Sequence, residues 1–252
     1  MKNQDSWKPS KFVVRKGRLR GSRDSRELSV GSRLIADLVA EQYSLHLPEH
    51  CRGELLDLGC GKVPLYGLYR DLVSGVVCVD WAQTLNASNH LDHELDLTKP
   101  LPLGDDSFDT ILLSDVLEHL PEPGRLLAEV SRLLRPGGKL IGNTPFLYWL
   151  HERPHDYFRY TDVALRRLLE SAQLEVLSLR AVGGYGEVLT DLLAKRFTSF
   201  GVPGRLLARA VQALTWQLNN NARRAERDTA FPAGYFFVAT KVGAAPAARP
   251  LV

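Results

Sequence analysis

The sequence has few cysteines and no long hydrophobic run. Cys51, Cys60 and Cys78 are the only three cysteines, and no CxxC or Cys/His spacing accompanies them. This odd, small number argues against a secreted disulfide scaffold and against a zinc site. The longest apolar runs fall short of the roughly 18 residues that span a bilayer, and no apolar region follows the basic N-terminus to make a signal peptide. We therefore expect a cytoplasmic protein.

The net charge of +3 conceals an uneven distribution. Residues 1–26 hold nine basic side chains against Asp5 and Asp24, a net charge of about +7, which leaves about −4 on the remaining 226 residues. Such an arm fits an anionic partner, either a phosphorylated carrier or an anionic membrane contacted peripherally. Termini are also commonly solvated and loosely ordered. We expect residues 1–28 to form a basic, flexible arm and leave its partner open.

Strand-like and helix-like apolar patterns alternate along most of the chain. Strands are predicted at 54–58, 76–81, 108–113, 139–143, 174–182 and 235–242, and helices at 29–45, 65–72, 116–134 and 161–173. This alternation predicts a parallel sheet covered on both faces. With 252 residues, 44% of them apolar, we predict one doubly wound α/β domain over 29–243. It has an N-terminal helix, a helical insertion at 184–230 and a loose tail at 244–252.

A glycine-containing turn follows the first predicted strand. Gly59 and Gly61 allow the loop to pass close to a ligand, at the strand edge where open α/β sheets bind ligands. The dinucleotide fingerprint would need a third glycine at position 64, where this chain has Pro64. Asp80 ends the second strand about twenty residues later, where an acid can accept both ribose hydroxyls. A nucleoside without a diphosphate fits both features.

Four segments in this order and spacing resemble the class I S-adenosylmethionine-dependent methyltransferases, and within them the type 11 subgroup. These segments are DLGCG at 57–61, the acid Asp80, the stretch 96–120 (DLTKPLPLGDDSFDTILLSDVLEHL) and LLRPGGKLIGNTP at 133–145. The resemblance covers about residues 50–183 and the last strand. It implies a Rossmann-like sheet of seven strands in the order 3-2-1-4-5-7-6, with the last strand antiparallel, and S-adenosyl-L-methionine as the cofactor.

The resemblance also assigns cofactor contacts by position. The methionine part would be lined by the loop after the first strand and by a serine after the fourth, the ribose would bind the acid of the second strand, and the adenine would lie between an aromatic residue and a following Asp-Leu pair. The residues that match are Asp57, Gly59, Cys60, Gly61, Ser114, Asp80, Trp81, Asp96 and Leu97. Trp81 also fits the alternative of an ordinary core aromatic.

Asp115, Glu118 and His119 share one face if residues 116–134 form a helix. Similar clusters bind a divalent metal in some O-methyltransferases, whereas an interior polar anchor or a general base at His119 are the alternatives. We predict no metal here and keep His119 as a candidate base.

The loop after the fifth strand, 144–161, concentrates histidines, acids and aromatic residues between Pro145 and the next helix. Loops at this edge of the sheet commonly carry function. One interpretation is an acceptor pocket, with His151 as base, Asp156 orienting it, and substrate contacts from Tyr148, His155, Tyr157, Arg159 and Tyr160. The other is a structural lid in which Glu152, Asp156 and Arg159 form ion pairs.

We predict O-methylation of a hydroxyl on a sugar or glycan that a carrier can hold, in line with a bacterial type 11 subgroup associated with glycan or natural-product tailoring. A small quinone-like or secondary metabolite as acceptor, and a non-catalytic cofactor-binding protein, are the alternatives. Nucleic acid is disfavoured, because the chain has no NPPY-type or Pro-Cys motif and its body is acidic. The oligomeric state stays open.

Overall fold

The computed structural model of the protein describes residues 1–15, 17–81, 89–222 and 230–243. Seven strands form the central sheet in the order β5-β4-β3-β6-β7-β9-β8, and β9 is antiparallel to both of its neighbours. The strands are β3 (Glu54–Leu58), β4 (Gly75–Asp80), β5 (His93–Glu94), β6 (Phe108–Ser114), β7 (Leu134–Pro145), β8 (Leu174–Val182) and β9 (Gly234–Lys241). Numbered within the sheet, this order is 3-2-1-4-5-7-6, so the predicted fold is confirmed.

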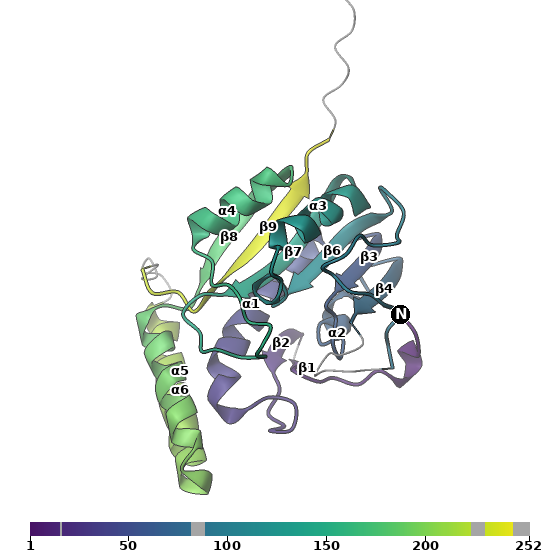
Figure 1. Ribbon diagram of the computed structural model, residues 1–252. Helices are drawn as coiled ribbons and strands as arrows, with labels where there is room; N and C mark the ends of the chain where they lie inside the picture. Colours follow the sequence, from purple (N-terminus) through teal and green to yellow (C-terminus); the bar gives the residue numbers. More distant parts are fainter. Residues whose placement is uncertain (16, 82–88, 223–229, 244–252) are drawn as a thin grey trace, which may run out of the picture.

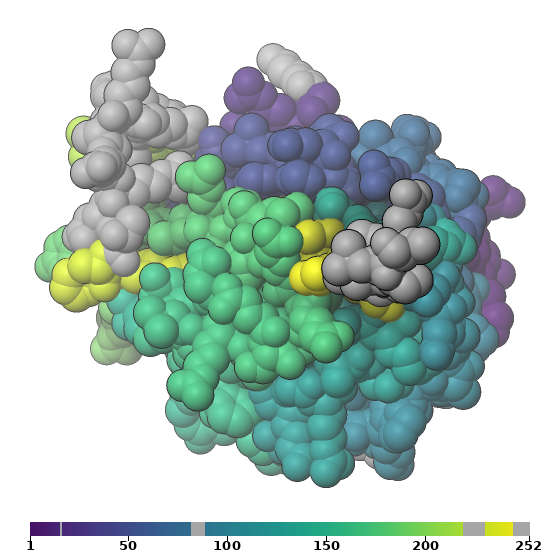
Figure 2. All heavy atoms as spheres, turned by 90° about the horizontal axis from the view of Figure 1, so that it is seen from above, coloured from purple at the N-terminus to yellow at the C-terminus, as the bar shows by residue number. Residues whose placement is uncertain are grey.

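Helices cover both faces of the sheet. They are α1 (Arg33–His50), α2 (Tyr66–Tyr69), α3 (Pro123–Leu133), α4 (Asp162–Ser171), α5 (Tyr185–Thr198) and α6 (Gly201–Ala222). Seen from above, the N-terminal segment and α1, in purple and blue, form one side of the molecule, and the teal and green segments form the other (Figure 2). α5 and α6 lie side by side and project away from the sheet (Figure 1).

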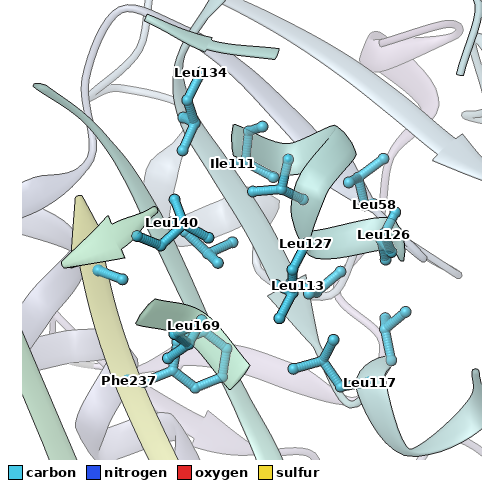
Figure 3. Close-up of a cluster of buried hydrophobic side chains, with 14 of the residues drawn as sticks. Leu58, Ile111, Leu113, Leu117, Leu126, Leu127, Leu134, Leu140, Leu169 and Phe237 are labelled. Atoms are coloured by element: carbon cyan, nitrogen blue, oxygen red, sulfur yellow. The ribbon is translucent and has the colours of Figure 1, made fainter. Parts of the chain in front are cut away.

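Alternation along the strands divides the core into two layers. Ile111 and Leu113 of β6 pack with Leu127 of α3 and Leu169 of α4 on one face (Figure 3). Leu112, between them in sequence, packs on the opposite face with α1 and α2. Successive side chains of a strand point to opposite faces, so one buried strand supplies both layers.

The long helix predicted at 116–134 is wrong. A single 3₁₀ turn, Leu117–His119, follows β6, and α3 begins only at Pro123. Two causes are visible: Asp115 has a φ of +54°, which no α-helix accommodates, and Pro121 and Pro123 follow immediately. The grouping of Asp115, Glu118 and His119 on one helix face is therefore also wrong.

The prediction of a flexible arm at 1–28 is also wrong for most of its length. β1 (Phe12–Arg15) pairs with β2 (Arg18–Gly21) in an antiparallel hairpin. Phe12 and Leu19 retain only 1% and 2% of their exposure and join the core layer of α1 and α2. Apolar residues placed between the basic ones supply this anchor, while most of the arginines stay at the surface.

The insertion predicted at 184–230 forms α5 and α6 as far as residue 222; residues 223–229 and the tail at 244–252 lie outside the described residues. Val30, Ala194 and Ala208 make a small core where the two helices meet the start of α1. Within the described part of the chain, no helix is both long and apolar enough to cross a membrane.

Candidate active site

The loop between β3 and α2 has an unusual backbone. Gly59 has a φ of +71°, and a Cβ there would lie 2.5 Å from Cγ2 of Val116. Val63 has a φ of +50° and is fully buried, although left-handed backbone is unfavourable for a β-branched residue. Its carbonyl accepts a hydrogen bond of 3.0 Å from the indole of Trp7. Backbone strain of this kind is common at ligand sites. Because residue 59 is a glycine, a ligand could approach the backbone of this loop closely.

Two buried carboxylates flank this loop. Asp80, at the end of β4, accepts from the Gly61 amide at 2.8 Å and from the Trp81 amide at 2.8 Å. Asp57, at the end of β3, accepts from the Tyr69 hydroxyl at 3.1 Å. Burial raises the pKa of Asp57 to about 7, and the Asp80 charge adds to the shift. The loop and both acids fit a nucleoside with a cationic amino group, because the two carboxylates can accept hydrogen bonds and the glycine backbone leaves room for the ligand.

The other residues predicted from sequence to contact the cofactor have different surroundings. Cys60 is buried within it, and Trp81 meets the His155 ring edge-on at 5.1 Å. Leu97 packs on the core, whereas the Asp96 carboxylate is engaged locally, accepting from the Thr98 amide and hydroxyl. These hydrogen bonds lower the pKa of Asp96.

A second polar group lies at the ends of β6 and β7. The Asn143 carbonyl oxygen accepts from the Tyr43 hydroxyl at 2.7 Å and the Ser114 hydroxyl at 2.9 Å, while its amide donates to Asp115. Lys11, from the N-terminal segment, donates to Asp115 at 2.9 Å. Sequence reasoning missed Lys11, Tyr43 and Asn143. Only Asn143 left a signal, as a polar residue ending an apolar strand.

Glu118, His119 and His151 meet beside this group. Their candidate ligand atoms all lie within 4.8 Å of one another. Glu118 is fully buried, and its Oε1 has no hydrogen-bond partner. Burial, reinforced by the Asp115 charge, raises its pKa well above the ordinary range. The metal set considered from sequence is not the one assembled, since His151 takes the place of Asp115.

Both histidines are oriented through Nδ1. Nδ1 of His119 lies 2.6 Å from the carbonyl of His155, which can only accept, so this nitrogen carries the proton. For His151, Nδ1 lies 3.5 Å from Oδ2 of Asp156, which also accepts from the His151 amide at 2.8 Å. Each Nε2 then faces Oε1 of Glu118, at 3.7 Å and 3.9 Å. Burial, followed by the His119 charge, lowers the pKa of His151.

Arg159 closes the base of the 144–161 loop. Its guanidinium donates to both oxygens of Asp156, at 2.6 and 2.9 Å, and to the carbonyls of Trp149 and Phe158. Tyr160 is buried and donates to the carbonyl of Leu117 at 2.9 Å. These are contacts within the protein, as the structural-lid interpretation expects.

A cavity of about 270 Å³ lies between this loop and α1. Of the residues predicted for acceptor binding and catalysis, Tyr148, His151 and His119 line it, together with Lys11 and Asp115. His155, Asp156, Tyr157, Arg159 and Tyr160 are not among its described lining residues. The opposite wall is apolar and comes mainly from Leu28, Ile35, Ala36, Val39, Val182 and Ala233.

Comparison with known proteins agrees with this geometry. A family model described as a methyltransferase domain matches residues 56–142. A protein of Mycolicibacterium smegmatis, described as a probable S-adenosylmethionine-dependent methyltransferase, is 30% identical over 129 residues, 46% of this chain and 50% of that protein. A ubiquinone biosynthesis O-methyltransferase of Dinoroseobacter shibae is 28% identical over 170 residues, 56% of this chain and 68% of that one.

Among solved structures, the cyclase SpnF is similar in fold, with a TM-score of 0.53 and 20% identity over 94% of this chain and 87% of that chain. At this identity the likeness shows the fold alone. The chain spans half to about two thirds of the length of the two curated relatives.

Proposed function

Since the chain belongs to the class I S-adenosylmethionine-dependent methyltransferases, we propose that it transfers a methyl group to a hydroxyl of an acceptor bound in the cavity beside His151. The observation that carries this proposal is that two histidines and a lysine line one cavity together with Asp115, whose neighbour Val116 lies against Gly59 of the loop after β3. A hydroxyl acceptor must lose a proton on methylation, and a neutral imidazole is suited to remove it.

S-adenosyl-L-methionine would supply the activated methyl group when bound. Asp57 would accept from its amino group, Asp80 from its ribose hydroxyls, and the backbone of residues 59–61 would lie along its methionine part. Trp81, Asp96 and Leu97 would border the adenine, and Ser114 the methionine end. Methyl transfer is an in-line displacement, so the protein's main task is to align the acceptor oxygen with the methyl group and the sulfur, while the cofactor supplies the reactive group.

His151 is the first candidate for the base and His119 the second. The His151 Nδ1 faces Asp156, which is itself held by Arg159, so Asp156 acts as a positioning residue. In the tautomer whose Nδ1 donates to the Trp149 carbonyl, 3.3 Å away, Nε2 is the atom able to take a proton. The lowered pKa of His151 keeps this nitrogen unprotonated at neutral pH. Arg159 and Tyr160 would shape the loop, with His155 and Tyr157 at its outer edge.

The first candidate acceptor is a sugar or glycan hydroxyl, and the second a quinone-like metabolite. The charged wall of Lys11, Asp115 and Glu152 favours a polyhydroxylated ring. The apolar wall, and the name of the Dinoroseobacter relative, favour an aromatic one. A cavity of about 270 Å³ is at the small end of ligand pockets, so it would take a single ring in either case. Methyl glycosides and dihydroxybenzoates, assayed by release of S-adenosylhomocysteine, separate the two.

With an acceptor in hand, His151→Ala is expected to lower turnover about 100-fold, the low end for loss of a general base. Wild-type turnover should fall only below about pH 6.5, the unperturbed value for histidine, because the pKa of His151 is lowered; the variant should lose this acidic limb. His50→Ala, at the end of α1 that precedes β3, is the matched control and should match wild type. His119→Ala is measured in parallel.

Two results would contradict this assignment. If neither histidine variant lowers turnover while both still bind S-adenosylhomocysteine in calorimetry, no histidine is the base. Chelation supplies the other result. Turnover should survive dialysis against EDTA, whereas a loss that Mg²⁺, Mn²⁺ or Zn²⁺ restores would transfer the role to a cation held by Glu118, His119 and His151.

A further inference from the structure

A second, larger cavity lies away from the acceptor site. It measures about 1030 Å³ and is formed by the β1–β2 hairpin, the first turns of α1 and one side of α6. Six arginines line it: Arg15, Arg18, Arg20, Arg23, Arg33 and Arg209. The acidic side chain among the described lining residues is Asp37. This concentration of one charge far exceeds the average for a chain whose net charge is +3.

The positive charge in the cavity is left largely uncompensated. Asp37 is committed to Arg23, at 2.6 Å, and to the Gly21 amide, at 2.9 Å. Over the described residues, the other five arginines of the cavity form no ion pair. Like charges brought together at this density repel one another unless an anion lies between them.

Arg33 is the clearest case of a charged group in this cavity that is buried without an ion-pair partner. Its side chain is 95% buried, and its Nε has no hydrogen-bond partner, although Nη2 donates to the Arg23 carbonyl at 2.6 Å. Buried charged groups are normally paired. A buried guanidinium without a carboxylate partner, on the wall of an open cavity, points to an anionic ligand that would offset its charge.

Apolar and aromatic surface accompanies the arginines. Trp216 lies on the wall, with the Arg20 guanidinium 4.8 Å from its ring centre, and Leu34 and Ala213 flank it. Gln212 and Gln217 add amides. The cavity thus offers a charged region for an anion and an apolar region for the group attached to it.

We propose that this cavity binds the diphosphate group of a phosphorylated organic ligand. Arginine forks match phosphate oxygens bidentately, and several arginines suit an anion of more than one charge. Ser32 lines the acceptor cavity and Arg33 lines the basic one, so the two cavities lie on either side of the start of α1. The site is therefore placed to hold a diphosphate carrier near the acceptor cavity, yet its binding does not depend on methyl transfer.

The test is calorimetric titration of the full-length protein with inorganic pyrophosphate at about 0.1 M salt. Arg20→Gln on β2 and Arg209→Gln on α6 each remove a guanidinium group that is exposed or half-exposed, and melting temperatures check that each variant is folded. Each is expected to weaken binding about tenfold, the loss of one charge-assisted hydrogen bond. Arg166→Gln on α4, whose arginine is exposed and pairs with Glu170, is the matched control and should bind as wild type does.

Absence of pyrophosphate binding, or an equal loss in all three variants, would overturn the proposal, because the attraction would then be general. Competition identifies the source of the diphosphate group. Displacement of pyrophosphate by uridine diphosphate indicates a soluble ligand, and displacement by vesicles containing a polyprenyl diphosphate indicates a lipid-linked one. Either supports the site; failure of both to compete overturns it.

Discussion

Single residues set the chemistry of the proposed cofactor loop, residues 59–63. Asp57 is 4% exposed, and among the described residues its side chain accepts a hydrogen bond from the Tyr69 hydroxyl alone. Burial therefore raises its pKa to about 7. A cationic amino group placed beside it would favour the ionised form. Cofactor binding and proton release are then linked at this one residue, whereas Asp80, fixed by two amides, serves as a constant acceptor.

This linkage predicts a pH-dependent affinity. Because the pKa of Asp57 is raised to about 7, its protonated form predominates at lower pH and cannot pair with an ammonium group. Affinity for S-adenosylhomocysteine should therefore be about tenfold weaker at pH 6 than at pH 8. Asp57→Asn should remove the dependence, and Asp71→Asn, whose side chain is 85% exposed, should keep it. A wild-type profile that is flat in calorimetry across this range would refute the role of Asp57.

At the scale of elements, the N-terminal segment is part of the catalytic domain. Trp7 donates to the strained Val63 carbonyl, and Lys11 donates to Asp115 at the acceptor cavity. Phe12 and Leu19 hold the hairpin between these contacts against the core. Removing residues 1–26 would thus disturb the cofactor loop, the acceptor cavity and the arginine cavity at once, so point substitutions are the cleaner probes.

Phe12→Ala should destabilise the whole domain. Phe12 is 1% exposed, and loss of a fully buried phenyl ring costs about 3 kcal/mol or more. For a chain of this length that lowers the melting temperature by roughly 6–12 °C. Val14→Ala, on the same strand but 44% exposed, should change it little. Melting is measured by circular dichroism. Equal melting temperatures for the two variants would mean that the hairpin does not unfold cooperatively with the rest of the domain.

At the scale of the molecule, one sheet edge gathers groups from distant parts of the chain. Lys11, Tyr43, Asp115 and Asn143 meet there, and the carboxyl ends of β3, β4, β6 and β7 bring the cofactor loop beside them. Ligands of open α/β sheets bind at this edge. The two cavities flank α1, so this helix separates the proposed transfer site from the proposed anion site.

Cofactor binding should stabilise the entire fold. S-adenosylhomocysteine at 100 times its Kd adds about 2.7 kcal/mol, which raises the melting temperature by roughly 5–11 °C. Gly59→Ala should abolish the shift, because its Cβ would strike Val116. Gly137→Ala is the control: Gly137 also has a left-handed φ, +77°, but nothing lies within 4 Å of its Cβ. The Gly137→Ala variant should have a lower melting temperature without ligand but should keep the ligand-induced shift. If it loses the shift as Gly59→Ala does, the steric argument is contradicted.

The local hydrophobic pattern of the sequence was enough to predict most strands of the sheet. Two strands, 54–58 and 174–182, were placed at their observed limits. The first is a buried parallel strand with a nearly continuous apolar run, whereas the second is an antiparallel edge strand that mixes apolar and exposed polar residues. Thr161 caps α4 through the Ala164 amide, near where the predicted helix began. The motif order then predicted the sheet topology, confirmed here, because each motif marks the end of a particular strand.

Other features required long-range contacts. The charge of residues 1–26 masked Phe12 and Leu19, whose burial depends on α1 and α2. The helix predicted from Val116 neglected Pro121 and Pro123, and the metal alternative built on that helix named Asp115 rather than His151. Arg159 and Tyr160 were expected at the acceptor, and only the fold reveals that their polar atoms bond within the protein.

The sequence by itself determined the class of fold and the position of the glycine loop after β3, because these depend on spacing within one strand–loop–helix unit. The tertiary structure decided which side chains come together: two histidines beside a buried glutamate, and six arginines from the β1–β2 hairpin, the loop after it, α1 and α6. Such groupings join residues far apart in the chain, and their proximity follows from packing, which no local pattern records. The charge distribution shows this, since only the fold brings arginines from the N-terminal hairpin, α1 and α6 around one cavity.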